Sequence, residues 1–325
     1  MGSDWDRVAG GPFKALHHGQ MVGIGAAMEG MVGYPTFQLL FDMAWCRQEA
    51  DIDKWTARYA LQRYGRSNKL AHRAWELLKE SVYDTRAFTQ HSCVFCNCPD
   101  GLSWASAIGR NPKPFPYDQG RFVSAWRSLL DAADSFQTIS TYRFDVTDVT
   151  RQVLDNLGLW QYGRMMEAHK KKLPAEFEKQ SRIFLNMILD EDRLLNTQEG
   201  FLLGRWIADA RRLSRSVDEK LLLEHNARTL LTVWGPRPGL ADYAAREWAG
   251  MLRSFYFPRW NLWVREQRNI LKGQAASPVS YFDWALNWTT GKTEFSPKPF
   301  GDSIIEARRI VNKYRSMLKE AGQWI

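Results

Sequence analysis

The sequence predicts a mainly α-helical fold in which a short strand-bearing segment precedes a large helical array. Residues 1–33 are rich in glycine and show little helical periodicity, whereas apolar residues recur at helical spacing in nearly every later segment. A hydrophobic content of 45% in 325 residues is enough for a substantial core. Because no fixed-period repeat is present, a solenoid is excluded.

The individual elements follow from local signals. Residues 21–25 are expected to form a short strand, and helical spacing begins near Phe37. Asp53 is expected to cap a helix that Gly65 ends, and another helix runs over about 67–83. Residues 84–118 form a long proline- and cysteine-containing loop, a kind that is often functional. Further helices are expected at about 119–135, 141–172, 174–194, 198–213, 217–231, 240–256, 258–272 and 302–320.

The chain is basic, with a formal net charge of +8 and a pI near 9.3. Its Lys and Arg are scattered, and the one tight run, Lys170–Lys172, is expected to be a solvated helix end. No RNA- or DNA-reading motif accompanies the charge, so we expect no nucleic-acid partner. No apolar stretch approaches the ~18 residues of a membrane span. The first residues do not form a signal peptide, so an export signal would lie upstream.

The four cysteines are Cys46, Cys93, Cys96 and Cys98. With His91, the last three spell His-x-Cys-x-x-Cys-x-Cys, which suggests zinc. A structural zinc site usually has two ligand pairs separated by a longer stretch, and the sequence offers no second pair. We therefore expect free thiols or one disulfide in this loop, no metal site and no cofactor.

Gly23-x-Gly25 resembles part of a dinucleotide-binding fingerprint. The third glycine position holds Met28, and a single strand precedes it. Because that fingerprint requires a βαβ unit with a downstream acidic residue, nucleotide binding is rejected.

A Trp-Gly-Pro corner at 234–236, an aromatic stretch from Leu240 and the run Pro258-Arg259-Trp260 are the most informative features. They resemble the all-α C-terminal region of family 89 glycoside hydrolases, the α-N-acetylglucosaminidases. Residues 23–30 resemble the strand end that carries that family's nucleophilic carboxylate. Segments 142–152, 201–206, 226–228 and 300–302 also fall in family order.

The resemblance implies that residues 1–45 are the C-terminal remnant of a catalytic (β/α)-barrel and that residues 46–325 are an all-α domain. It assigns Glu29 the role of nucleophile in retaining hydrolysis of terminal α-linked N-acetylglucosamine, as in heparan sulfate breakdown. Catalytic carboxylates lie at the C-terminal ends of barrel strands, and a retaining enzyme needs two about 5 Å apart. From the residues alone, a Glu at such a turn is more often a helix N-terminal charge.

The resemblance also implies a sugar-binding surface on the helical domain. Trp234 would stack on the sugar ring, Leu240 and Tyr243 would line the acetamido side, and His91 would reach the substrate from the loop. The competing interpretation makes Trp234 a packing residue beside a helix end. The cysteine run 93–98 departs from the family pattern.

The strand carrying the general acid is expected upstream, so the isolated chain should be inactive without its barrel. The partners are then that barrel and an N-acetylglucosamine-terminated glycan, in a lysosomal or secreted protein if an upstream signal exists. The alternative is a non-catalytic helical module that binds a protein or glycan.

Overall fold

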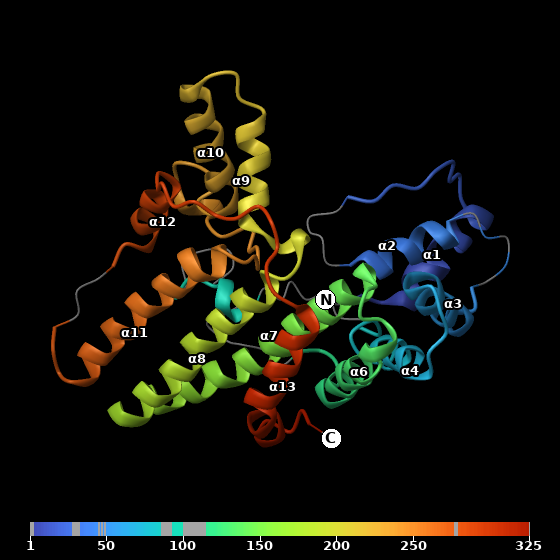
Figure 1. The fold of residues 1–325 in the computed structure, drawn as a ribbon, viewed down its shortest axis with the longest axis horizontal. Coiled ribbons are helices and arrows are strands. Elements are labelled where there is room, and N and C mark those ends of the chain that lie inside the picture. The colour runs from blue at the N-terminus through green and yellow to red at the C-terminus, as the bar shows by residue number, and fades with distance from the viewer. Residues whose placement is uncertain are drawn as a thin grey trace. The chain divides into compact units, whose positions relative to one another are not determined.

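The computed structural model describes residues 3–27, 33–44, 46, 48, 50–85, 93–99, 115–275 and 279–324. The chain divides into two compact units. The first comprises residues 1–90, 115–153 and 307–325, and the second comprises residues 91–114 and 154–306. Helices make up both units (Figure 1), and the described ranges contain only isolated bridges in place of strands. The expected mainly α fold is thus confirmed. The domain boundary at residues 45–46 stays a prediction.

The first unit is built from helices that pack in sequence-neighbouring groups. Its elements are α1 (Trp5–His18), α2 (Tyr34–Met43), α3 (Ile52–Tyr64), α4 (Lys69–Lys79), α6 (Gln119–Asp131), η2 (Ala133–Ser135), the start of α7 (Ser140–Lys170) and the end of α13 (Ser303–Glu320). Helix α1 packs against α2 and α3, and α4 packs between α3 and α6 (Figure 1).

Local caps explain where α3 and α4 begin and end. The Asp51 carboxylate accepts a hydrogen bond from the Lys54 amide at 2.9 Å, so Asp51 caps α3 and the expected cap Asp53 is wrong. Gly65 ends α3 as predicted, because its φ of 75° suits a residue without a Cβ. The Asn68 side chain then caps α4.

Helix α1 is absent from the sequence prediction. Two adjacent glycines and Pro12 weaken its helical pattern, yet Asp4 caps it through the Arg7 amide at 3.0 Å. Burial of Trp5 explains the outcome: its ring stacks on Tyr83 at 4.2 Å between centroids. Tertiary packing therefore overrides weak local propensity.

The expected strand at 21–25 is not formed, since residues 20–27 have no regular structure. Val22 is 96% exposed. A strand satisfies its backbone groups only through a neighbouring strand, and no described residue pairs with this segment. Whether it is a barrel remnant stays a prediction.

The second unit carries the remaining elements. They are η1 (Val94–Cys96), the later part of α7, α8 (Pro174–Leu195), η3 (Glu199–Phe201), α9 (Leu203–Arg212), α10 (Val217–Leu231), η4 (Pro238–Leu240), the π-helical turn η5 (Leu252–Tyr256), α11 (Phe257–Leu271), α12 (Tyr281–Thr289) and the start of α13. Helices α9 and α10 lie side by side as an antiparallel pair, and α11 packs along α8 (Figure 1).

Most predicted helices from residue 119 onward are confirmed within a few residues, and α12 was missed. The helix predicted at 240–256 is wrong. Residues 241–249 form turns and irregular backbone, and η5 then leads directly into α11. Asp242 and Ala245 adopt positive φ values of 62° and 41°, which a right-handed helix excludes.

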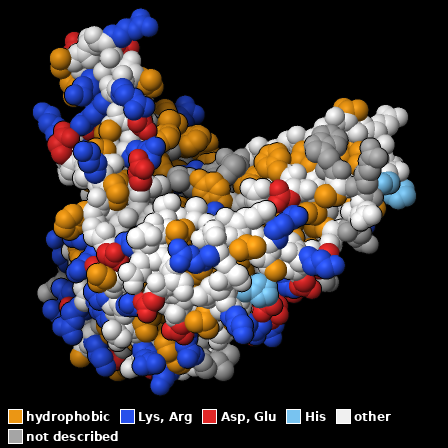
Figure 2. All heavy atoms as spheres, turned by 45° about the vertical axis from the view of Figure 1, so that its right-hand side comes forward, with side chains coloured by type: hydrophobic (Ala, Val, Ile, Leu, Met, Phe, Trp, Pro, Cys, Tyr) orange, Lys and Arg blue, Asp and Glu red, His pale blue; other side chains and the backbone are white. Residues whose placement is uncertain are grey.

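Charge on the face shown in Figure 2 is mixed: Lys and Arg side chains alternate with acidic and hydrophobic ones over the α9–α10 pair. Arg205 of α9 forms an ion pair with Glu199 at 2.5 Å. Among the helices of the described part, none is long and apolar enough to cross a membrane.

Candidate functional site

The corner after α10, by which we mean residues 232–245, presents the indole ring of Trp234. Helix α10 ends at Leu231, and the Trp234 amide donates a hydrogen bond of 2.8 Å back to the Thr229 carbonyl. Thr232 and Val233 are buried, which fixes the chain on the inner side of the corner. Trp234 itself remains 40% exposed. A Trp that served only to pack the helix end would be covered, so its exposure favours the binding interpretation.

Tyr243 lies next to this indole, and Leu240 precedes Tyr243 in the same turn. The rings of Trp234 and Tyr243 meet edge to face, with centroids 5.4 Å apart and planes at 62°. The Tyr243 amide donates to the Leu240 carbonyl at 3.1 Å, and Leu240 is exposed. The corner therefore combines a flat aromatic face, an apolar side chain and a phenol hydroxyl, which suits the apolar face and polar edge of a sugar.

Backbone strain is concentrated at this corner. In the described ranges, four residues other than glycine have positive φ: Lys172, Trp234, Asp242 and Ala245. Three of them belong to the corner, and Trp234 has φ of 61°. A bulky residue in this region costs roughly 1–2 kcal/mol, and such strain persists where the surroundings enforce it, often at functional sites.

A buried ion pair lies at this corner and includes Asp242, one of the residues with positive φ. Nη1 of Arg259 donates to both carboxylate oxygens of Asp242, at 2.9 and 2.8 Å. The side chains are only 1% and 3% exposed. Nη2 of Arg259 also donates to the Cys96 carbonyl at 2.9 Å. Burial lowers the pKa of Arg259, but the Asp242 carboxylate more than offsets it, so this pKa is raised and the guanidinium stays charged.

Asp242 and Arg259 are the positioning residues that sequence reasoning missed. The sequence analysis used Arg259 only as part of a family motif at the helix end. An Arg inside the aromatic run 255–260 was nevertheless a usable signal, because a charge among buried rings requires a charged partner.

Glu29 and His91 lie outside the described residues, so their predicted roles as nucleophile and substrate contact stay predictions. Only Trp234, Leu240 and Tyr243 of the expected site are brought together in the described structure. All three belong to the second unit.

The cysteines Cys46, Cys93, Cys96 and Cys98 are free thiols, one of the two states expected. Cys93 caps the turn η1 and Cys96 ends it, and carboxylates of the same unit lie close to them. These are the described side chains best suited to hold a metal ion.

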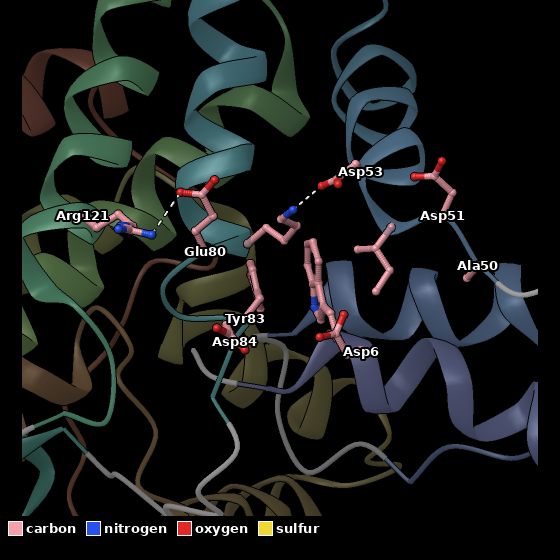
Figure 3. A pocket seen from close by; sticks show the side chains of 11 residues that line it. Asp6, Ala50, Asp51, Asp53, Glu80, Tyr83, Asp84 and Arg121 are labelled. Atoms are coloured by element: carbon pink, nitrogen blue, oxygen red, sulfur yellow. Dashed lines mark hydrogen bonds and ion pairs between the residues drawn. The ribbon is translucent and has the colours of Figure 1, made fainter.

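A polar hollow in the first unit is lined from α1, α3, α4, α6 and their flanking turns (Figure 3). Nη1 of Arg121 lies 3.2 Å from a Glu80 oxygen, and the Lys79 ammonium contacts Asp53. Both cations are thus held by carboxylates of the same rim, and the other acidic side chains are Asp6, Asp51 and Asp84. None of the expected site residues lies there, and acidic rims are common on protein surfaces, so no function is assigned to it.

Comparison with known proteins gives a consistent result. A family model described as the Alpha-N-acetylglucosaminidase (NAGLU) C-terminal domain matches residues 55–313. Human Alpha-N-acetylglucosaminidase is 29% identical, over 98% of this chain and 44% of its own length.

Two solved structures of a family 89 glycoside hydrolase from Clostridium perfringens have the same fold. CpGH89, with two Glu→Gln substitutions and bound to its substrate GlcNAc-α-1,4-galactose, superposes with a TM-score of 0.87 and 28% identity. The complex with PUGNAc gives a TM-score of 0.88, also at 28% identity. Both alignments cover 96% of this chain and 37% of the other.

The chain therefore spans less than half the length of these relatives. The family match extends over most of the sequence and agrees with the helical fold. The chain belongs to the family of α-N-acetylglucosaminidase C-terminal domains.

Proposed function

We propose that this chain is the C-terminal portion of an exo-acting α-N-acetylglucosaminidase and that its corner at Trp234 forms one wall of the sugar pocket. The indole would stack on the ring of the terminal sugar, and Leu240 and Tyr243 would line its acetamido side. The observation that carries this proposal is the exposed Trp234 ring, held at positive φ beside Tyr243.

The relatives support the same substrate class. The Clostridium perfringens enzyme is solved with a GlcNAc-α-1,4-galactose substrate, and with PUGNAc. A pocket that binds such a sugar gains from one flat apolar wall, because the carbon face of the ring is thereby removed from water. The corner offers that wall together with a phenol hydroxyl for a polar edge.

The chemistry assigned to Glu29 belongs to the same proposal. As the nucleophile of a retaining enzyme, its carboxylate would form a glycosyl-enzyme intermediate that water then hydrolyses. The acid that protonates the leaving oxygen would come from an upstream barrel strand. One carboxylate cannot perform both steps at full rate, so the 325-residue chain alone should hydrolyse an aryl α-N-acetylglucosaminide poorly or not at all. The same proposal includes heparan sulfate as the glycan that is broken down and a lysosomal or secreted location for the protein.

The role of the corner is tested by PUGNAc binding to the longer enzyme, which is this chain together with the proposed upstream barrel. Trp234→Ala should weaken binding by about 1–3 kcal/mol, because it removes the stacking face. Trp206→Ala is the matched control, since Trp206 is 39% exposed in the same unit and its indole N–H donates to the Ala227 carbonyl at 3.0 Å. The control should leave inhibitor affinity unchanged.

Melting temperature separates the two interpretations of Trp234. Replacing a buried packing Trp by Ala lowers the free energy of unfolding by about 3–5 kcal/mol. Replacing the half-covered Trp234 should lower it clearly less. A large melting-temperature drop with unchanged PUGNAc affinity would favour the packing role and, with it, the non-catalytic helical module.

A further inference from the structure

The turn η1 gathers two thiols and a carboxylate at one buried point. The Sγ atoms of Cys93 and Cys96 and a carboxylate oxygen of Glu247 all lie within 4.8 Å of one another. A second, overlapping set joins Cys93 and Glu247 to Asp155 and Glu191 within the same limit. Apart from the half-buried Glu247, these side chains are buried.

These ligands come from four different parts of the second unit. Cys93 caps η1 and Cys96 is its last residue, Asp155 lies on α7, Glu191 on α8, and Glu247 follows the turn that carries Leu240 and Tyr243. The sequence analysis rejected zinc because no second cysteine or histidine pair follows the Cys-x-x-Cys. In the folded chain, the carboxylates of Asp155, Glu191 and Glu247 take the place of that second pair.

The atom types and spacing suit a tetrahedral divalent ion. Zinc binds thiolates at about 2.3 Å and carboxylate oxygens at about 2.0–2.2 Å, which places neighbouring ligand atoms roughly 3.3–3.8 Å apart. The ligand atoms of each set lie within 4.8 Å of one another, so side-chain rotations would bring them closer together as the ion binds. Two thiolates favour zinc over the harder calcium and magnesium ions, which prefer oxygen ligands alone.

The backbone of the turn is fixed independently of any metal. Arg259 donates to the Cys96 carbonyl and the Trp260 indole donates to the Phe95 carbonyl, each at 2.9 Å. The Phe95 amide donates to Cys93 Sγ at 3.3 Å. An amide hydrogen bond to a ligating sulfur is the kind of outer interaction that stabilises a thiolate in metal sites.

Both thiols are buried, and burial raises the pKa of each above its ordinary value. A divalent cation that binds the two sulfurs would displace their protons.

We propose that Cys93, Cys96 and Glu247 form a structural zinc site. Asp155 or Glu191, which approach Cys93 and Glu247 in the second set, would have to move toward Cys96 to supply the fourth ligand. The ion would tie the segment before Gly250 to η1, α7 and α8 and so hold the corner in place. The half-buried Glu247 gives the ion its entry from solvent. The proposal does not depend on sugar binding, because its test reads metal content and stability without a sugar.

The test uses the full 325-residue chain, purified with reductant and stripped by a chelator. Added Zn²⁺ should bind at about one ion per chain and raise the melting temperature, since a ligand that binds only the folded state stabilises it. Co²⁺ should give a thiolate-to-metal charge-transfer absorption. Cys93→Ser should lower Zn²⁺ affinity by more than about 100-fold, because even outer partners of a metal site cost 10–100-fold.

Cys46→Ser is the matched control, since the Cys46 thiol of the first unit donates to the Asp42 carbonyl at 3.2 Å. It should keep full affinity. Should Cys93→Ser fail to fold, Glu247→Gln serves in its place, and the Co²⁺ spectrum of the wild type still reports thiolate ligation. Absence of Zn²⁺ uptake with all four thiols reduced would overturn the proposal. So would an equal loss in Cys46→Ser, or a Cys93–Cys96 disulfide that forms in the purified protein and leaves it unable to bind zinc.

Discussion

The buried pair of Arg259 and Asp242 gives the sharpest stability prediction. Asp242→Asn keeps the side-chain shape, one acceptor oxygen and tolerance of positive φ, but it removes the negative charge. Because both side chains are almost fully covered, the guanidinium would be left without its counter-charge. Removing one partner of a buried pair costs 3–5 kcal/mol, and we expect about 3 kcal/mol here because one hydrogen bond survives.

Urea unfolding and thermal melting would measure this loss. For a unit of 150–250 residues, each kcal/mol lowers the melting temperature by about 2–4 °C, so Asp242→Asn should lower it by roughly 6–12 °C. Arg205→Ala is the control: it breaks an exposed pair with Glu199, which should be worth about 1 kcal/mol or less. Adding Arg259→Met to Asp242→Asn removes the stranded charge and should recover part of the loss.

Two results would contradict a stabilising role of this pair: a loss of stability in Asp242→Asn no larger than in Arg205→Ala, or a deeper loss when Arg259→Met is added. Either result would mean that water reaches the pair and that the corner is held by other contacts.

Three further predictions concern packing, pH and local stability. Gly158→Ala should destabilise by about 1–3 kcal/mol, because its Cβ would lie 2.4 Å from a buried phenylalanine ring, whereas Gly163→Ala on the same helix meets open space and should stabilise by up to about 1 kcal/mol in urea unfolding. Because folding raises the pKa values of Cys93 and Cys96, these thiols contribute fully to the free energy of unfolding below the ordinary thiol pKa of about 8.5. That contribution is lost as the pH rises toward their pKa values in the folded protein. Metal-free protein should therefore lose stability between pH 7 and 9.5 more steeply than the double Cys→Ala variant at these positions. An equal dependence of stability on pH would contradict the raised thiol pKa values. Residues 20–27 should exchange their amide hydrogens fastest in the isolated chain; protection equal to that of the helices would show that they have found a backbone partner.

Local patterns predicted most of the helices after residue 115, because apolar spacing and terminal signals are short-range features. The same reasoning failed at 240–256, where Asp242 and Ala245 take left-handed backbone angles. Asp242 there pairs with Arg259, 17 positions further along the chain, and a contact of that range leaves no trace in local periodicity. Helix α1 failed for a related reason, since its stability rests on Trp5 packing against distant rings.

The candidate sites also include residues that the sequence indicated and one that it did not. Family resemblance nominated Trp234, Leu240 and Tyr243, and the structure places them together. The approach of Glu247 to Cys93 crosses more than 150 positions of the chain, so it became visible only in three dimensions. A motif search limited to cysteine and histidine pairs had no means of including a carboxylate from a remote turn.

We propose above that Glu29 is the nucleophile of an α-N-acetylglucosaminidase whose pocket this chain completes. A slow fluorinated N-acetylglucosamine-type substrate should trap the glycosyl-enzyme in the longer enzyme, and mass spectrometry of its peptides should locate the added sugar on Glu29. Glu29→Gln should carry no label and should lose nearly all turnover of an aryl α-N-acetylglucosaminide while keeping its melting temperature. A label on another residue, or turnover of Glu29→Gln within about tenfold of the unsubstituted enzyme, would contradict the claim.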